Sequence, residues 1–253
     1  NVYNQEPLSY DEIMEWCRSQ AEFFKDYICD VGTLLGAAAG QGKNILFEAQ
    51  LGALRDIDYG IYPFTSSSNT IASYAPIGAG IPGCALDNVV GVMKAYSTCV
   101  GEGPFVAETA MGEAWNEKLR ESGGEFGAAT GRPRRVGPFD AVASRYGIRC
   151  QKAQDIALTK LDVLGAFDKI PVITGYRLHG VLLDSFPTDS RLEEAEPVIE
   201  ELPGWGCDIS GCRSWRDLPE NARKYVCTLE KLVDHPIYLV STGAERDAYL
   251  LRE

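Results

Sequence analysis

The sequence lacks several features that define large classes of protein. It has no run of about 18 apolar residues that could span a membrane, and neither the basic segment nor the apolar core of a signal peptide. Basic residues are in the minority, because 24 Lys and Arg face 36 Asp and Glu, for a net charge of -12. This charge disfavours general attraction to nucleic acids or anionic membranes. We expect a soluble, cytoplasmic protein with no nucleic-acid or membrane partner.

Histidines are scarce and cysteines are dispersed, which argues against a structural metal site. The only histidines are His179 and His235, and of the eight cysteines only Cys207 and Cys212 are close in sequence. A C-x4-C pair without a second pair is a poor zinc template. Scattered cysteines also do not form the framework of a small disulfide-rich domain. We expect reduced thiols and no metal bound by this chain.

The alternation of apolar strands and helices predicts the fold class. With 253 residues, 45% of them hydrophobic, the chain can bury a full core. Apolar spacing predicts one long or two short helices over residues 9–39 and another helix over 218–233. Short apolar runs predict strands and a hairpin, at 44–49, 89–96, 156–164, 170–175, 180–184 and 237–240. The expected fold is α/β, with a mostly parallel central sheet, flanking helices, long ligand-binding loops and a small antiparallel hairpin.

One stretch resembles a phosphate-binding loop only superficially. Residues 36–44, GAAAGQGKN, approach the pattern G-x-x-x-x-G-K-[ST], but Ala37 stands at its first glycine and Asn44 at its final hydroxyl residue. The stretch also follows a predicted helix and leads into a predicted strand. That order is the reverse of the one that points backbone amides at phosphate. We interpret it as a helix-to-strand turn.

Two short motifs follow predicted strands, where parallel sheets place their ligand contacts. The first is Thr159-Lys160-Leu161-Asp162. A carboxylate there could accept hydrogen bonds from N1-H and the exocyclic amine of guanine, while a lysine stem lies along the purine. On these residues alone, a strand-end Asp that caps the next turn is the simpler alternative. The second motif, residues 241–244, is a small-residue turn whose amides could approach a base edge.

Three arginines stand in a glycine-bounded segment of this acidic protein. The segment is GAATGRPRRVG, residues 127–137, and contains Arg132, Arg134 and Arg135. Guanidinium groups offer paired donors that suit carboxylates and phosphates. A solvated basic turn is the alternative. We favour a binding loop that is ordered mainly by its anionic ligands.

Eight blocks resemble adenylosuccinate synthetase in order and spacing. They are FEAQLGALRDIDYGIYP (47–63), SSSNT (66–70), KAYSTCVGEGPF (94–105), EFGAATGRPRR (125–135), LTKLDVL (158–164), LPGW (202–205), LPENARKYV (218–226) and STGAER (241–246). The resemblance covers essentially all of the chain after the first predicted helix. It indicates the C-terminal portion of this family's protein, with residues 1–253 as part of one large domain.

The resemblance implies a GTP-dependent ligase of AMP biosynthesis. In the family, the γ-phosphate of GTP moves to O6 of IMP, and the amino group of aspartate then displaces it. The P-loop, the catalytic groups and most of the Mg²⁺ site belong to a part that these residues do not contain. The resemblance therefore implies no catalytic or metal-binding residue here, no activity of the chain by itself, and a homodimer at full length. A stand-alone module that binds guanine nucleotide or another anion is the alternative.

The resemblance also assigns ligand contacts by position. GTP contacts fall on Arg134, Lys160, Leu161, Asp162, Ser241, Thr242 and Gly243. The loop that closes over aspartate falls on Ala128, Ala129, Thr130, Gly131, Arg132, Pro133 and Arg134. IMP contacts fall on Ser66, Arg132 and either Gln50 or Leu51. The last pair stays open because the family's FEGAQG reads FEAQLG here: a gapless match puts Leu51 at the family's glutamine, with Gln50 one residue early.

Four further departures from the family's pattern occur. The histidine of the family's DIDHG is Tyr59, the arginine of its TRVG block is Cys99, and the first threonine of its loop is Ala129. The family's GPDR reads Gly243-Ala244-Glu245-Arg246 here. The charged positions expected to contact GTP and aspartate are retained.

Overall fold

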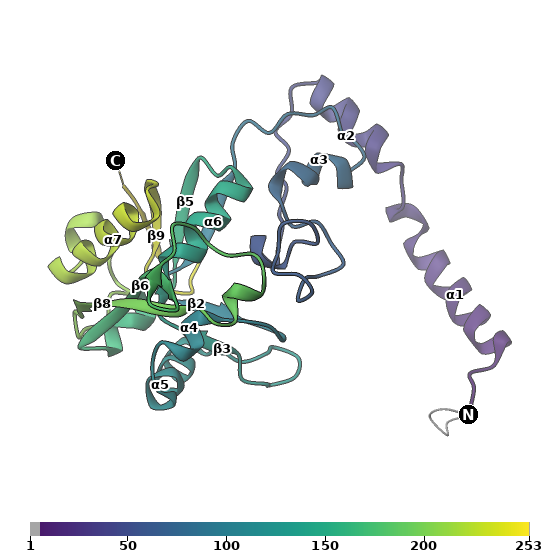
Figure 1. Cartoon of the computed structure of the whole chain (residues 1–253). Helices are drawn as coiled ribbons and strands as arrows, with labels where there is room; N and C mark the ends of the chain where they lie inside the picture. Colours follow the sequence, from purple (N-terminus) through teal and green to yellow (C-terminus); the bar gives the residue numbers. More distant parts are fainter. Residues whose placement is uncertain (1–5, 253) are drawn as a thin grey trace. The chain divides into compact units, whose positions relative to one another are not determined.

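The computed structural model describes residues 6–252 and divides into two compact units, each considered by itself (Figure 1). Unit 1 consists of Asn1–Phe47 and Ala75–Ala85, and unit 2 of Glu48–Tyr74 and Leu86–Glu253. No helix among the described residues is long and apolar enough to cross a membrane.

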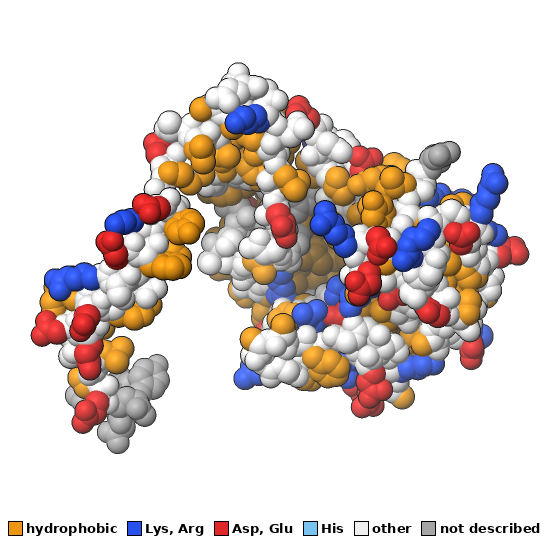
Figure 2. Space-filling view, turned by 180° about the vertical axis from the view of Figure 1, so that it is seen from behind, with side chains coloured by type: hydrophobic (Ala, Val, Ile, Leu, Met, Phe, Trp, Pro, Cys, Tyr) orange, Lys and Arg blue, Asp and Glu red, His pale blue; other side chains and the backbone are white. Residues whose placement is uncertain are grey.

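Unit 1 is helical. It contains α1 (Tyr10–Phe24), η1 (Lys25–Tyr27), α2 (Val31–Gly40) and α3 (Ala75–Gly78). A capping box starts α1, because the Ser9 hydroxyl accepts from the Glu12 amide and the Glu12 carboxylate accepts from the Ser9 amide, both at 3.1 Å. Of the two alternatives predicted over residues 9–39, the structure has the two short helices, α1 and α2. Figure 2 shows exposed apolar side chains along α1, Trp16 and Phe23 among them.

The segment that follows α2 forms the expected turn but leads into no strand, so it is not the helix-to-strand turn that the sequence predicted. The P-loop-like stretch ends α2 in a tight turn, with Gly42 at φ +70° and the Lys43 amide donating to Ala38 O at 3.0 Å. The strand predicted over residues 44–49 is wrong, because the structure has no strand there and Leu46 is 93% exposed. An apolar run becomes a strand only where a neighbouring strand accepts its hydrogen bonds, and these residues are in no ladder.

The main sheet of unit 2 has the order β1-β5-β9-β10. Its two central strands, β5 and β9, are labelled in Figure 1. β1 (Val90–Lys94), β5 (Asp155–Thr159) and β9 (Ile237–Ser241) run parallel, and β10 (Tyr249–Leu251) is antiparallel to β9. This confirms the predicted parallel-rich sheet. β5 is shorter than predicted, because Lys160 turns the chain with φ +60° and Asp162–Ala166 forms the 3-10 helix η4.

A second sheet carries the predicted hairpin. β6 (Lys169–Leu178) pairs antiparallel with β7 (Val181–Leu182) and β8 (Glu196–Pro203), and parallel with β4 (Phe139–Asp140). β8 was not predicted, because its residues are mostly polar or half-buried and show no clear alternation. A two-stranded sheet joins β2 (Ser97–Cys99) and β3 (Arg135–Gly137).

Helices cover the sheets and close the core. α7 (Glu220–Val233) buries Ala222, Tyr225, Val226, Leu229 and Val233 in the same cluster as β5 and β9, as its helical apolar spacing predicts. The Tyr225 hydroxyl donates to Ala95 O at 2.6 Å, just beyond the end of β1. The remaining helices are η2 (Ala53–Arg55), η3 (Ala72–Tyr74), α4 (Val106–Thr109), α5 (Glu113–Gly123), α6 (Ala141–Gln151), η5 (Ser190–Leu192) and η6 (Trp215–Asp217).

Leu158 of β5 tests how much the parallel sheet contributes to stability. Its side chain is fully buried, so Leu158→Ala removes apolar contacts and leaves a cavity. We expect the free energy of unfolding to fall by about 2–5 kcal/mol, measured by urea denaturation. Val92 of β1 is 72% exposed. Val92→Ala should therefore stay within about 0.5 kcal/mol of the wild type. Equal losses in the two variants would contradict this view of the core.

Candidate functional site

The carboxyl ends of β1, β5 and β9 meet at one edge of the main sheet. The three strands are parallel neighbours, and the Ala95 amide donates to Thr159 O at 2.8 Å just beyond their ladder. Lys94, Lys160 and Ser241 are therefore brought to the same edge, although they are far apart in sequence. The two strand-end motifs that the sequence suggested lie beside each other.

The structure places Asp162 differently from a strand-end cap. Asp162 opens η4, but no side-chain cap bond is present there, and among residues 6–252 no group donates a hydrogen bond to its carboxylate. The side chain is half-buried. Leu161 is fully buried in the core, so a ligand could reach only its backbone. The capping alternative therefore has no support from the geometry, and the carboxylate stays available as an acceptor.

The Lys160 side chain is held by contacts with Gly123 and Glu125. Its Nζ donates to Gly123 O at 2.6 Å and lies 3.5 Å from Glu125 Oε1, while 38% of the side chain remains exposed. The left-handed backbone at Lys160 is costly for a residue with a Cβ and is maintained here by these contacts.

The turn after β9 is fixed by its own hydrogen bonds. The Ser241 hydroxyl donates to Gly243 O at 2.9 Å. Thr242 is fully buried, and its amide donates to Ala248 O at 2.8 Å and its hydroxyl to Cys212 O at 3.3 Å. An added Cβ at Gly243 would lie 3.2 Å from the Ala248 Cβ, so the absence of a side chain keeps this turn close-packed.

Glu125 is the electrostatic centre of the site. Its fully buried carboxylate accepts from Lys94 Nζ at 2.8 Å and the Tyr96 hydroxyl at 2.6 Å through Oε1, and from Arg134 Nη1 at 2.8 Å through Oε2. Burial alone would raise the pKa of Glu125, but the hydrogen bonds from Lys94 and Tyr96 outweigh it and lower the pKa to about 2. Burial, together with the nearby charges of Lys160 and Arg134, lowers the pKa of Lys94.

The arginine segment forms a closed loop between Glu125 and Arg134. The Arg134 amide donates to Glu125 O at 2.9 Å, and a β-bridge joins Phe126 and Pro133. Gly131, at φ +64°, donates its amide to Gly127 O at 2.8 Å. The residues at the tip of this loop are exposed, namely Ala128, Ala129, Thr130, Gly131, Arg132 and Pro133. The predicted loop therefore presents its tip to solvent and is anchored at its base.

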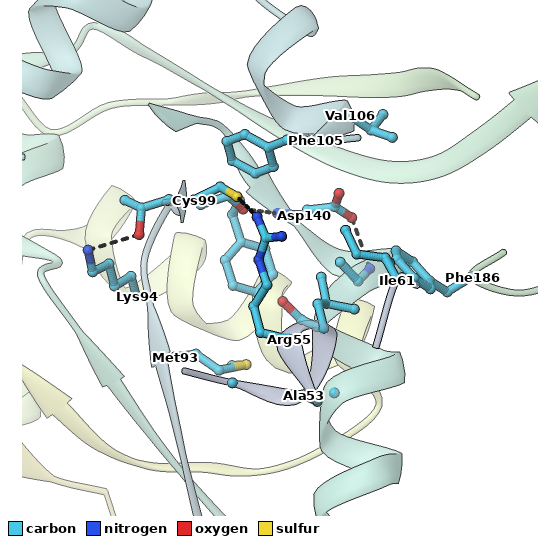
Figure 3. A pocket seen from close by; sticks show the side chains of 18 of the residues that line it. Ala53, Arg55, Ile61, Met93, Lys94, Cys99, Phe105, Val106, Asp140 and Phe186 are labelled. Atoms are coloured by element: carbon cyan, nitrogen blue, oxygen red, sulfur yellow. Dashed lines mark hydrogen bonds between the residues drawn. The ribbon is translucent and has the colours of Figure 1, made fainter. Parts of the chain in front are cut away.

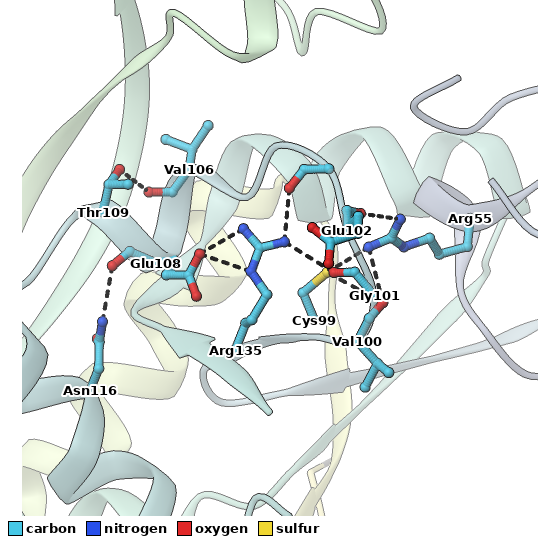
Figure 4. Close-up of polar contacts among 11 residues, drawn as sticks. Arg55, Cys99, Val100, Gly101, Glu102, Val106, Glu108, Thr109, Asn116 and Arg135 are labelled. Carbon is cyan, nitrogen blue, oxygen red and sulfur yellow. Dashed lines mark hydrogen bonds and ion pairs between the residues drawn. The ribbon is translucent and has the colours of Figure 1, made fainter. Parts of the chain in front are cut away.

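The three arginines of this loop have different surroundings. Arg134 is anchored on Glu125, whereas the Arg132 side chain is exposed. Arg135 makes an ion pair with Glu108 at 2.6 Å and donates to Gly101 O and Gly103 O (Figure 4). Arg135 thus supports the loop after β2, and Arg132 keeps its guanidinium available.

A cavity of about 460 Å³ opens beside the end of β1 (Figure 3). Lys94, Arg134, Arg55 and Cys99 line it together with apolar groups such as Phe105. Arg55 Nη2 lies 2.7 Å from Cys99 Sγ and donates to Val100 O at 3.1 Å. Fully buried Asp140, whose pKa is raised by burial, accepts from the Tyr176 hydroxyl at the cavity wall.

The predicted IMP contacts are only partly brought to this cavity. Leu51, with φ +73°, lines it, whereas Gln50 is exposed and is not among the lining residues. The Ser66 hydroxyl lies in a local turn, where it donates to Ser68 O at 3.1 Å. Neither Ser66 nor Arg132 lines the cavity.

Sequence reasoning missed Lys94, Glu125, Arg55 and Asp140. Lys94 lies within the block KAYSTCVGEGPF, directly after an apolar run, so its place at a strand end was a usable signal. Glu125 and Arg55 also lie within quoted blocks, but no strand end marks them, because their importance depends on partners 31 and 44 residues away along the chain.

The depressed pKa of Glu125 predicts acid sensitivity. The ordinary pKa is 4.5 and the folded-state value about 2, so the unfolded chain binds the proton first as the pH falls. The stabilisation by Glu125 is present above about pH 4.5 and is lost as the pH approaches about 2. From about pH 5 to about pH 3, wild-type protein should lose about 2 kcal/mol more unfolding free energy than Glu125→Gln. Urea denaturation at each pH measures this, and exposed Glu121→Gln should follow the wild type. Parallel pH dependences for wild type and Glu125→Gln would refute it.

Relatives in other organisms match the chain along nearly its whole length. An adenylosuccinate synthetase of Trichlorobacter lovleyi is 48% identical over 248 residues, which are 98% of this chain and 57% of the relative. One from Pelotomaculum thermopropionicum is 45% identical over 251 residues, which are 99% of this chain and 58% of the relative. The chain thus spans less than two thirds of the length of these curated relatives.

A solved structure and a family model agree with these relatives. The structure of fully ligated adenylosuccinate synthetase from Plasmodium falciparum superposes with a TM-score of 0.93 at 34% identity, covering 100% of this chain and 60% of that one. The family model for adenylosuccinate synthetase matches residues 1–250. The chain therefore belongs to the adenylosuccinate synthetase family.

Proposed function

We propose that this chain supplies the guanine-reading edge, the IMP cavity and the aspartate loop of a GTP-dependent synthetase that ligates aspartate to IMP. The observation that carries the proposal is the convergence of three parallel strand ends, β1, β5 and β9, beside the anchored arginine loop. Parallel α/β sheets bind ligands at this edge. Family membership supports the same reaction for the full-length protein.

Guanine recognition rests on the half-buried carboxylate of Asp162. An ionised carboxylate can accept from both N1-H and the exocyclic amine of guanine, whereas adenine presents an unprotonated N1 acceptor. Lys160, already fixed through Gly123 O, offers its alkyl stem to the purine face. The turn of Ser241, Thr242 and Gly243 lies on the neighbouring strand end, where its backbone lies close to the same ligand. Leu161 contributes through its backbone.

IMP is assigned to the cavity beside β1. Its volume of about 460 Å³ falls in the range typical of small-molecule sites. Lys94 and Arg134 give its wall positive charge, which suits a nucleoside monophosphate. Leu51 offers an apolar contact to the base, and Gln50 would need a local backbone change to reach it. The Ser66 hydroxyl is assigned to the phosphate of IMP. Ser66 does not line the cavity, but its amide donates to the backbone oxygen of Arg55, which does.

The aspartate substrate is assigned to the loop formed by residues 128–134. Arg132 has an exposed guanidinium at the loop tip, and Arg134 is fixed at its base. Paired N–H donors match the carboxylates of a dicarboxylic acid. The same two arginines are assigned contacts with IMP and GTP respectively, so closure of the loop would bring the three ligands together. An exposed tip on an anchored base suits such a movement.

The other parts of the reaction are assigned outside these residues. Within residues 6–252, no group of three or more His, Cys, Asp or Glu side chains is placed to hold a metal ion. As the resemblance implies, we assign Mg²⁺, which would neutralise charge on the transferred phosphoryl group, mainly to the part of the family's protein that these residues do not contain. The proposal treats residues 1–253 as the C-terminal portion of one large domain in a cytoplasmic homodimer.

The isolated chain should show no synthetase turnover. It contributes no P-loop and no catalytic group of the family, so the phosphoryl step has no machinery here. The measurement is adenylosuccinate formation from GTP, IMP, aspartate and Mg²⁺ by purified residues 1–253. The same assay on a full-length relative is the positive control. Product above the protein-free background would contradict the assignment of roles.

Base selectivity tests the role of Asp162 in the full-length protein. Asp162→Asn keeps the shape but removes the charge and one acceptor, so GTP binding should weaken by about 2–3 kcal/mol, roughly thirty- to a hundredfold. The amide can turn its NH₂ toward a keto oxygen, so xanthosine triphosphate should gain relative to GTP. Competition titrations of GTP, xanthosine triphosphate, ATP and ITP measure the preference.

Lys160→Ala is the matched control for base selectivity. Its side chain is assigned to the purine face and does not read the base edge, so GTP and xanthosine triphosphate should weaken alike. An unchanged preference between these two nucleotides in Asp162→Asn would show that Asp162 does not read guanine.

A further inference from the structure

One buried carboxylate joins the two parts of the proposed site. Glu125 contacts the ammonium of Lys160 from the guanine-reading edge and the guanidinium of Arg134 from the arginine loop. It also binds Lys94, which lines the cavity. These three cations come from three segments of the sequence, which are the end of β1, the turn after β5 and the arginine loop. Among the contacts of residues 6–252, Glu125 is the anion that all three share.

The two oxygens of Glu125 divide these partners. Oε1 accepts from Lys94 and the Tyr96 hydroxyl and lies 3.5 Å from Lys160 Nζ, whereas Oε2 accepts from Arg134. A rigid carboxylate whose oxygens are both occupied cannot rotate without breaking bonds on both sides. A change in the position of Lys160 is therefore transmitted to Arg134.

The backbone at Glu125 extends the connection into the loop. Glu125 N donates to Arg120 O at 2.9 Å at the end of α5, and Glu125 O accepts from the Arg134 amide at 2.9 Å. Gly123, which accepts from Lys160, lies two residues earlier. A Cβ at Gly123 would lie 2.5 Å from the Tyr96 hydroxyl, so the backbone at Gly123 is closely packed against Tyr96. The two ends of the loop, Glu125 and Arg134, are thus joined to each other by backbone and side-chain contacts.

We infer that Glu125 is a positioning residue that couples guanine nucleotide binding at the strand ends to the order of the loop formed by residues 126–133. This inference rests on the proposed function, because it takes the nucleotide as the ligand that further restrains the Lys160 side chain, which is still 38% exposed. Occupation of the edge restrains Lys160, the shared carboxylate restrains Arg134, and the loop opens less often.

The test uses the full-length protein that contains residues 1–253, with GDP as the probe. Calorimetry measures GDP affinity, and hydrogen–deuterium exchange measures amide protection of residues 126–133 with and without GDP. In wild-type protein, GDP should slow exchange in this loop by about threefold or more. In Glu125→Gln, GDP should bind about fivefold more weakly, and at saturation the loop should exchange at its nucleotide-free rate.

Two further variants separate coupling from a loss of stability. Arg134→Gln leaves the contacts of Glu125 with the lysines. Because Arg134 is an assigned nucleotide contact, GDP should bind this variant more weakly, and at saturating GDP its effect on the loop should disappear. It decides the matter if Glu125→Gln fails to fold. Glu121→Gln, exposed on α5, should behave as wild type. A purely structural role would speed exchange in the empty protein but leave the ratio of rates with and without GDP unchanged.

The outcomes distinguish the inference from the proposed function. GDP that binds wild-type protein without protecting the loop would overturn the coupling and leave guanine recognition intact. A loop response that persists in Glu125→Gln, or in Arg134→Gln, would also overturn it. Absence of GDP binding to the folded wild-type full-length protein would overturn guanine recognition and, with it, the coupling.

Discussion

The parallel pairing of β1, β5 and β9 is the constraint on which the rest of the site depends. Parallel neighbours end at the same edge, so pairing alone gathers Lys94, the residues after Thr159 and those after Ser241. The pairing is enforced by burial, because the central residues of β5 are buried and α7 packs its apolar face in the same core. Packing therefore fixes where the polar groups stand, and the polar groups themselves add little to the choice of fold.

The site concentrates positive charge although the protein as a whole is negatively charged. The chain carries a net charge of -12, yet Lys94, Lys160 and Arg134 face the single anion Glu125. Removing a carboxylate from water is costly, and the cost is offset here because both oxygens accept charge-assisted hydrogen bonds. The cluster keeps a local excess of positive charge. Anionic ligands are therefore drawn to one edge of an otherwise acidic molecule.

The sequence predicted those parts of the fold and site that depend on local pattern. Helices α1, α2 and α7, strand β9 and the β6–β7 hairpin follow from apolar spacing and turn residues within short windows. The strand-end motif at Asp162 and the arginine loop were visible for the same reason. Residues 44–49 were mispredicted because apolar character does not guarantee a pairing partner, and β8 was missed because an edge strand needs little apolar pattern. Glu125 begins one of the quoted blocks, but its role could not be predicted because its partners Lys94 and Tyr96 lie on distant segments.

A neighbouring arginine compensates for the departure from the family pattern at Cys99. The family pattern expects an arginine there, so the cysteine suggests a lost positive charge in the cavity wall. Arg55, however, extends from η2 and places Nη2 2.7 Å from Cys99 Sγ, where it is further bound by Val100 O and Glu102 O (Figures 3 and 4). Both residues line the cavity. A guanidinium therefore lies beside the position where the family pattern expects one, although it belongs to a residue 44 positions earlier in the sequence. Arg55 thus gives this part of the cavity wall a positive charge. An anionic ligand is attracted by the position of the charge, whichever backbone segment carries the arginine.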